Sequence, residues 1–165
     1  MLLIAIAFLV VNGLIGRFRI EQVSMEPNLH EGEYVIVDKI SYLFHPPARG
    51  DVVVLKRTGE ADLIKRVIGL PGETLQVTGG QVQINGQPIV EPYLKDQHIN
   101  ADTPAQVIPA GHVFVMGDNR NNSSDSRVFG AVPITDVVGR AWIIYWPPPD
   151  WQVLSQPGYA APGTP

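Results

Sequence analysis

Short apolar runs separated by tight turns dominate residues 33–146, and this pattern constrains the fold more than any other feature. The clearest turn is Asn85-Gly86, which lies between alternating apolar and polar residues. Asn-Gly in such a place is the strongest local indication of a β-hairpin, because both residues tolerate the positive φ angles of a type I′ turn. Further turns come from sixteen glycines and fifteen prolines. Strands are predicted at 33–40, 51–56, 63–70, 74–78, 81–84, 112–116 and 136–146, and an irregular surface segment at 91–111. The sequence therefore predicts a mostly β fold.

The first sixteen residues contain no charged side chain and form a separate apolar segment. As a helix they would cover about 24 Å, which is less than the roughly 30 Å of a bilayer's hydrocarbon core. We favour a membrane anchor that is shortened at its start over two alternatives. A secretory signal peptide would begin with basic residues and end in an Ala-X-Ala cleavage site, and a buried core helix would have a polar face.

Two arginines, Arg17 and Arg19, follow the apolar segment directly. Basic residues beside an anchor favour the cytoplasmic side of a membrane, so these two alone would place the rest of the chain in the cytoplasm. Basic residues missing ahead of Met1 would remove the conflict with the location inferred below. We expect a β-rich domain over residues 17–149. Residues 150–165 are rich in Pro, Gly and Ala, which predicts a disordered tail.

Composition excludes several kinds of site. The formal net charge is −4, so nothing electrostatic favours nucleic acid as a partner. The chain has no cysteine, which removes disulfides, thiolate metal ligands and cysteine nucleophiles. Its histidines, His30, His45, His98 and His112, do not have the spacing of metal ligands, and we predict neither a metal nor another cofactor.

Ser24 and Lys65 are the candidate catalytic pair. Ser24 ends an alternating, extended stretch that starts at Phe18, and a turn at Pro27 follows it. Taken alone, a serine before a turn is more often a cap than a nucleophile. Lys65 lies inside an apolar run, where a lysine either protects a sheet edge or is buried. If it is buried, desolvation lowers its pKa, and the neutral amine can then take the proton of a serine hydroxyl.

A polar loop, residues 117–127, follows a predicted buried strand. Its composition alone suits an exposed, flexible loop. Paired charges and Asx-turns could instead lock it, because it contains two aspartates and two arginines. A catalytic lysine needs a fixed polar surrounding of this kind, in which the Ser123 hydroxyl could accept a hydrogen bond from the amine.

Four segments together resemble the bacterial type I signal peptidase family. The serine segment is Ser24–Leu29, with Asn28 where the family usually has Thr. The strand segment is Gly50–Val54, and the lysine segment is Lys65–Glu73, with its last residue Glu where Asp is frequent. The loop 117–127 contains the family's Gly-Asp-Asn-Arg…Ser-x-Asp-Ser-Arg pattern in full. The resemblance covers roughly residues 18–146 and implies an antiparallel β-sheet domain behind one N-terminal transmembrane segment.

The resemblance implies a role for each matched residue. Ser24 is the expected nucleophile and Lys65 the expected general base of a serine–lysine dyad. Ser123 matches the hydroxyl that orients the lysine. Asp125 and Arg127 match an ion pair that holds the loop.

Substrate contacts are implied as well. Met25, Leu29 and Ile64 match positions that line pockets for small substrate residues, and the Ser24 backbone N–H matches one oxyanion donor. Some family members add a serine hydroxyl two residues before the nucleophile, and others have glycine there. Gln22 occupies this position, so the second donor is either its amide or another backbone group.

The implied activity is that of a membrane-bound serine endopeptidase, which removes signal peptides from secreted preproteins through an acyl-enzyme. It would cleave after the small residue of an Ala-X-Ala site. The implied location is the cytoplasmic membrane, crossed once, with the catalytic domain on the extracytoplasmic face, in contact with the lipid bilayer and near the protein export machinery.

Two other functions are less consistent with the sequence. A self-cleaving, repressor-type peptidase shares the dyad but has a DNA-binding domain upstream, where this chain has an apolar segment. A membrane-tethered β scaffold that binds signal-peptide-like segments without cutting them would not need both Ser24 and Lys65.

Overall fold

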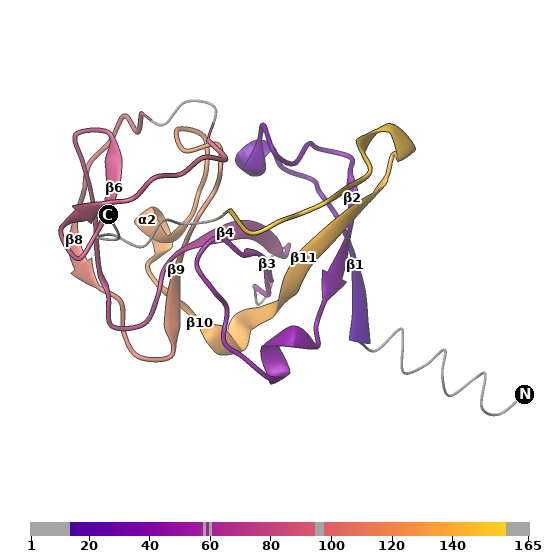
Figure 1. Ribbon diagram of the computed structural model, residues 1–165, viewed down its shortest axis with the longest axis horizontal. Coiled ribbons are helices and arrows are strands. Elements are labelled where there is room, and N and C mark those ends of the chain that lie inside the picture. The colour runs from indigo at the N-terminus through magenta and orange to yellow at the C-terminus, as the bar shows by residue number, and fades with distance from the viewer. Residues whose placement is uncertain (1–13, 58, 60, 95–97, 158–165) are drawn as a thin grey trace, which may run out of the picture.

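Antiparallel strands are the main regular elements of this protein, whose structure is a computed structural model that describes residues 14–57, 59, 61–94 and 98–157 (Figure 1). An eight-stranded sheet has the order β1-β2-β11-β3-β4-β9-β10, with β12 paired to β11. A four-stranded sheet has the order β7-β6-β5-β8. The smaller sheet lies at one end of the molecule and the pair β1 and β2 at the other (Figure 1). The predicted mostly β fold is therefore confirmed.

The larger sheet consists of β1 (Ile15–Arg19), β2 (Tyr34–Asp38), β3 (Val52–Leu55), β4 (Leu63–Gly69), β9 (His112–Met116), β10 (Val132–Pro133), β11 (Val137–Trp146) and β12 (Gln152–Val153). The smaller sheet consists of β5 (Thr74–Thr78), β6 (Gln81–Ile84), β7 (Gln87–Pro88) and β8 (Thr103–Val107). The helical elements are the short α2 (Ser126–Phe129) and the 3₁₀ turns η1 (Val23–Met25), η2 (Ser41–Leu43), η3 (Ile134–Asp136) and η4 (Pro148–Asp150).

The predicted Asn-Gly hairpin is present between β6 and β7. Asn85 and Gly86 have φ angles of 51° and 77°, as a type I′ turn requires. Ile84 then pairs with Gln87 across the hairpin. The other predicted strands between residues 33 and 146 agree with β2, β3, β4, β5, β6, β9 and β11 to within a few residues.

Two segments differ from the prediction. The expected extended stretch from Phe18 to Ser24 ends early, because β1 stops at Arg19 and Ser24 lies in the 3₁₀ turn η1. A residue far away in sequence holds this turn, since the backbone N–H of Asn119 donates to the Ser24 carbonyl at 3.0 Å. The predicted irregular segment 91–111 contains β8, which pairs with β5 along the edge of the smaller sheet.

The two predicted end segments fall partly outside the described residues. Of the predicted anchor, residues 1–13 lie outside, whereas Ile15 and Gly16 belong to β1. Of the predicted disordered tail, residues 158–165 lie outside, whereas Gln152–Val153 form β12. Among the described residues, no helix has the length and apolar character to cross a membrane.

Buried apolar side chains form three clusters: two include residues of β3 and β4, and one packs the smaller sheet against β4 and β9. The first cluster consists of Ile20, Met25, Leu29, Val35, Val37, Val52, Val54, Ile64, Ala141 and Ile144. The second consists of Ile68, Leu75, Val77, Val82, Ile84, Ile99, Ile108, Phe114 and Met116. The third consists of Val53, Leu55, Leu63, Val67, Val113 and Val115. Strands β3 and β4 contribute to the first and third clusters with alternate residues, as expected for a sheet covered on both faces. All seven residues of β4 are buried, so any functional side chain on this strand is shielded from water.

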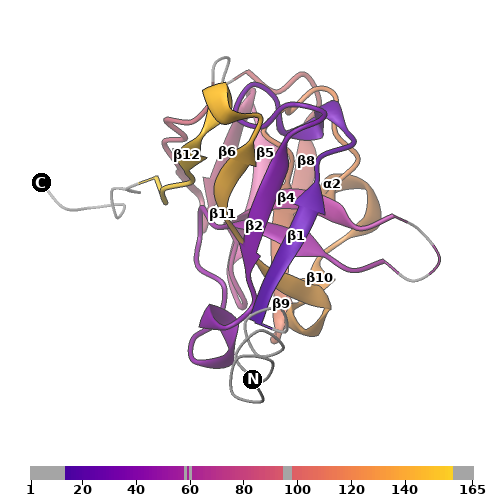
Figure 2. The ribbon, with the colours of Figure 1, turned by 90° about the vertical axis from the view of Figure 1, so that its right-hand side faces the viewer.

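Strand β1 is the outermost strand at its end of the larger sheet, next to β2 and then β11 (Figure 2). Its residues alternate between exposed and half-buried, so Arg17 and Arg19 share the exposed side with Ile15. An edge strand offers unpaired backbone groups to an additional extended segment. This edge leads directly to the turn that contains Ser24.

Candidate active site

Lys65 lies in the middle of β4, opposite Val53 of β3, and its side chain is fully buried. A buried ammonium group loses its hydration, which favours the neutral amine. Desolvation therefore lowers the pKa of Lys65 from 10.5 to about 8, although the negative charges of Asp125 and Asp118 oppose the shift. The alternative interpretation of Lys65 as a lysine at a sheet edge is wrong, because β3 and β9 flank β4 on both sides.

Ser24 reaches Lys65 from the turn η1. The two residues are 41 positions apart in sequence, and Lys65 Nζ donates a hydrogen bond to Ser24 Oγ at 2.7 Å. The amine also donates to the Ile64 carbonyl at 2.9 Å, which fixes its direction. Ser24 is itself buried, with 6% of its surface exposed. When the amine is neutral, the direction of the first bond can reverse and the hydroxyl can donate to the Nζ lone pair.

The predicted ion pair between Asp125 and Arg127 is present. Arg127 Nε and Nη2 each donate to the Asp125 carboxylate at 2.8 Å, in a bidentate arrangement. The same carboxylate accepts the Gly117 N–H at 3.0 Å, so it joins the two ends of the loop 117–127. Burial raises the pKa of Asp125, but the hydrogen bonds and charge of Arg127 outweigh it and lower the pKa below its usual value. The loop is therefore locked by charge, as proposed for it above.

Gly117 packs directly against the back of the nucleophile turn, with Ser123 on the same side of Gly117. A Cβ atom at Gly117 would lie 2.4 Å from the Ser24 carbonyl oxygen and 2.3 Å from Ser123 Oγ. Ser123 Oγ is buried and has no hydrogen-bond partner among the described residues. It lies near enough to favour the charged form of Asp125, but it does not bond to Lys65 Nζ. Its lysine-orienting role stays a prediction.

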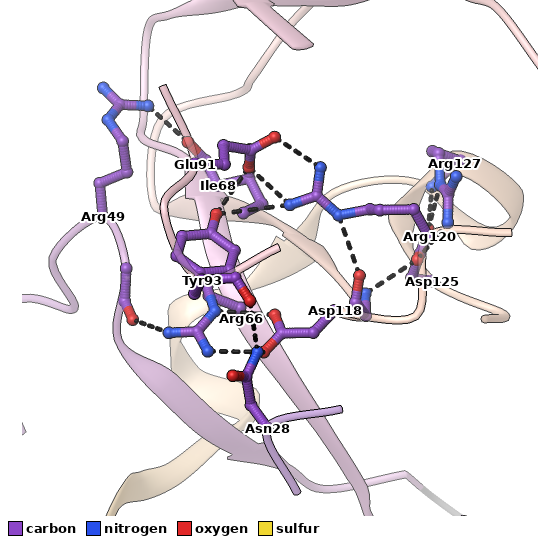
Figure 3. A network of polar contacts seen from close by, with 12 residues as sticks. Asn28, Arg49, Arg66, Ile68, Glu91, Tyr93, Asp118, Arg120, Asp125 and Arg127 are labelled. Carbon is purple, nitrogen blue, oxygen red and sulfur yellow. Dashed lines mark hydrogen bonds and ion pairs between the residues drawn. The ribbon is translucent and has the colours of Figure 1, made fainter. Parts of the chain in front are cut away.

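A second buried ion pair, between Arg66 and Asp118, was not predicted from the sequence (Figure 3). Arg66 Nε and Nη2 donate to the two oxygens of Asp118 at 2.8 and 2.6 Å. The guanidinium also lies 4.0 Å from the centre of the Tyr93 ring. Asn28 Nδ2 donates to Asp118 Oδ2 at 2.8 Å and to the Tyr93 carbonyl at the same distance. The one signal in the sequence was Arg66 itself, because a second cation inside an apolar run needs a buried anion.

A third pair, between Arg120 and Glu91, holds the loop from its other side (Figure 3). Arg120 Nη1 and Nη2 donate to the Glu91 carboxylate at 2.7 and 2.5 Å, and its Nε donates to the Gly117 carbonyl at 3.0 Å. Burial lowers the pKa of Arg120, but its bonds to Glu91 and that residue's charge outweigh burial and raise it. No local pattern marked Glu91, which lies in the segment predicted to be irregular.

A hollow of about 270 Å³ lies between the end of β1 and the start of β4, and its lining includes sequence neighbours of the dyad but neither Ser24 nor Lys65. Phe18, Gln22 and Ile64 contribute to its lining. Of the predicted pocket residues, Ile64 reaches this hollow, whereas Met25 and Leu29 are fully buried in the first cluster beneath it. Gln22 is exposed and makes no capping bond to η1. No group of three potential metal ligands occurs among the described residues, which include all four histidines.

Comparison with known proteins gives one consistent family. Residues 1–146 match the family model described as signal peptidase, peptidase S26. The chain is 49% identical over 134 residues to a signal peptidase I of Leptolyngbya laminosa, a match that covers 75% of this chain and 65% of that protein. It is 38% identical to signal peptidase I V of Bacillus subtilis, covering 82% of this chain and 89% of that one.

A crystal structure of a signal peptidase I from Enterococcus faecalis is 34% identical, with a TM-score of 0.51. That match covers 58% of this chain and 97% of the crystallised chain. The family match spans most of the sequence, and it includes both residues of the buried dyad and the whole charged loop. The chain therefore belongs to the signal peptidase family of S26 peptidases, and within it to the type I signal peptidases.

Proposed function

We propose that this chain is a serine endopeptidase that removes signal peptides from secreted preproteins, with Ser24 as nucleophile and Lys65 as general base. The observation that carries the proposal is the 2.7 Å contact between Lys65 Nζ and Ser24 Oγ, with the lysine fully buried. A pKa of about 8 leaves a useful fraction of the amine neutral near neutral pH. Its relatives are named signal peptidases I, which gives the substrate class.

In the proposed mechanism, neutral Lys65 takes the proton of Ser24 as Oγ attacks the carbonyl carbon of the scissile peptide bond. The tetrahedral intermediate collapses when the lysinium returns this proton to the leaving amine, which releases the mature protein. The signal peptide stays on Ser24 as an ester. Lys65 then deprotonates a water molecule, which hydrolyses the ester and restores both residues.

The negative charge on the carbonyl oxygen needs fixed donors during both steps. The Ser24 backbone N–H is one proposed donor, and the exposed Gln22 amide, which lines the hollow between β1 and β4, is the candidate for the second. Removal of one such donor typically costs about 100- to 1,000-fold in kcat.

The hollow next to β1 is the proposed position of the substrate segment before the cleaved bond. An extended peptide can add to the outer edge of β1, because no other strand of the described part of the chain pairs with that side. Ile64 lines the hollow beside Lys65, which suits a small apolar residue at the cleaved bond. Met25 and Leu29 would define the floor of this pocket from within the first cluster.

The proposed location is the cytoplasmic membrane, with the peptidase domain on the extracytoplasmic face near the export machinery. The uncharged segment ahead of β1 supports this location, because it would connect the domain to the bilayer. Protease protection and carbonate extraction of the full chain test it. Release of the protein by carbonate would contradict the anchor. Protection of the peptidase domain from a protease added on the extracytoplasmic side would contradict the orientation.

Cleavage of a peptide with an Ala-X-Ala site tests the function. We expect the detergent-solubilised protein to cut after the second alanine, and we expect Ser24→Ala and Lys65→Met to be folded and inactive. Lys65→Met keeps most of the side-chain volume and removes the amine, so its inactivity would report on chemistry. Equal cleavage by all three would exclude the dyad. A folded wild type that binds the peptide and never cuts it would favour the non-catalytic scaffold.

A further inference from the structure

The turn that contains Ser24 is held at both ends by two consecutive residues of the charged loop. At the nucleophile itself, the Asn119 backbone N–H donates to the Ser24 carbonyl, and just before it Asn119 Nδ2 donates to the Val23 carbonyl at 3.2 Å. On the side after it, Asp118 accepts a hydrogen bond from Asn28 at 2.8 Å. The position of Ser24 therefore depends on contacts on both sides of the turn.

Asp118 also fixes the strand that carries the base. Its carboxylate receives Arg66 in a bidentate pair, and Arg66 is the next residue after Lys65. One buried carboxylate thus receives a residue from the segment just after the nucleophile turn and a residue beside the base (Figure 3). Asp118 therefore links the segment after Ser24 to the strand that carries Lys65.

Asn28 makes a further bond that a hydroxyl side chain could not add. Its carboxamide has two N–H donors, and Nδ2 uses both acceptors within reach, Asp118 Oδ2 and the Tyr93 carbonyl. A threonine has one hydroxyl hydrogen and can donate to one of them at a time. The second bond joins the nucleophile turn to the segment around Tyr93, whose ring covers Arg66.

We propose that Asn28 is a positioning residue of this active site: its carboxamide clamps the Ser24 turn to Asp118 and to the Tyr93 carbonyl, and so keeps Ser24 closed over Lys65. The proposal rests on the proposed function of Ser24 and Lys65 for its kinetic part. Its structural part concerns whether water reaches the lysine, and that can be measured without any substrate.

Two substitutions of Asn28 separate the two bonds. Asn28→Ala removes both, and Asn28→Thr keeps one donor. We expect Asn28→Ala to reduce kcat roughly 10- to 100-fold, because a small displacement of a nucleophile has a cost of this size. We expect KM to change little, since Asn28 lies away from the hollow beside β1. Asn28→Thr should fall between Asn28→Ala and the wild type.

The activity-independent measurement is an NMR titration of the Lys65 side chain, assigned with Lys65→Met. An opened turn admits water to the amine, so in Asn28→Ala the pKa of Lys65 should rise from about 8 towards 10.5. The rising limb of the pH–kcat profile should move to higher pH with it. Asn100→Ala is the matched control, because it removes an exposed asparagine of the same size.

The outcomes distinguish this proposal from the proposed function. If Asn28→Ala has a wild-type kcat and an unchanged Lys65 titration, the clamp is wrong, even if the protein unfolds at a lower temperature. If the wild type cleaves no peptide but the Lys65 titration moves in Asn28→Ala, the clamp is supported and the proposed function fails. A shift of equal size in Asn100→Ala would also overturn the clamp.

Discussion

At the scale of single residues, the burial of Lys65 has a consequence for stability as well as for chemistry. The pKa of the amine is about 8 in the folded chain and 10.5 as its ordinary value. Between these values the unfolded chain binds more protons than the folded one, so the free energy of unfolding rises with pH. The rise attributable to Lys65 amounts to about 3 kcal/mol at most. Below pH 8 the folded chain is destabilised by the full cost of burying the protonated amine.

We therefore expect Lys65→Met to remove this pH dependence. Denaturant titrations of the wild type and of Lys65→Met at several pH values from 7 to 10.5 measure it. The stability difference between the two proteins should favour the methionine variant most at pH 7 and shrink as pH rises. Parallel stability curves would show that the pKa of Lys65 is ordinary in the folded state.

Gly117 gives a second prediction at the residue scale. A methyl group there would overlap the Ser24 carbonyl oxygen, which belongs to the backbone and cannot rotate away. We expect Gly117→Ala to destabilise the fold by about 1–3 kcal/mol, as overpacking does, and to displace the nucleophile. Peptide cleavage should fall about 100-fold at a temperature where circular dichroism shows the variant folded. An active variant with wild-type stability would mean that the turn and the loop can separate freely.

At the scale of elements, the segment after β11 contributes to the fold although the family match ends at residue 146. β12 pairs with Ile143 and Ile144 of β11, and the Leu154 N–H donates to the Trp142 carbonyl at 2.8 Å. The Leu154 side chain packs against the first cluster, whereas its neighbour Val153 is 63% exposed. The first cluster therefore includes a contribution from the predicted tail.

We expect Leu154→Ala to lower the free energy of unfolding by about 1–2 kcal/mol, because it removes partly buried apolar surface. Val153→Ala is the matched control and should change stability by less than about 0.5 kcal/mol. Urea unfolding of both variants measures the difference, and peptide cleavage at 25 °C should be unaffected in both. Equal stability of the two variants would show that the segment adds nothing to the core.

Elements with a strong local pattern were predictable, and elements held by distant partners were not. Strands β3, β4 and β11 are rich in β-branched residues, and the turn at Asn85-Gly86 fixes its own conformation. β8 has the sequence TPAQV, with mostly exposed residues, so its pairing with β5 defines it more than its own composition does. The turn η1 is held by a hydrogen bond from the Asn119 N–H to the Ser24 carbonyl. Because Asn119 lies 95 positions after Ser24 in sequence, no local pattern could predict this turn.

At the scale of the whole molecule, the sequence predicted the candidate pair Ser24 and Lys65, which the structure places in contact, but not the framework between them. Lys65 stood out because a lysine inside an apolar run is unusual, whereas Ser24 was marked only by the family resemblance, which connected the two. The pair of Arg66 with Asp118 spans 52 positions and the bond from Asn28 to Asp118 spans 90. Such pairs depend on the tertiary fold, since no local periodicity selects one acidic residue over another as the partner.

The order of the strands determines when Ser24 and Lys65 can come together during synthesis. β11 lies between β2 and β3, so it joins the strand pair that leads to Ser24 with the strand pair that carries Lys65. Both proposed catalytic residues are synthesised before residues 137–146, the strand that brings their halves together. Domains generally fold as units, and N-terminal parts of a chain are made first. The proposed dyad therefore cannot assemble until β11 has joined the two halves of the sheet.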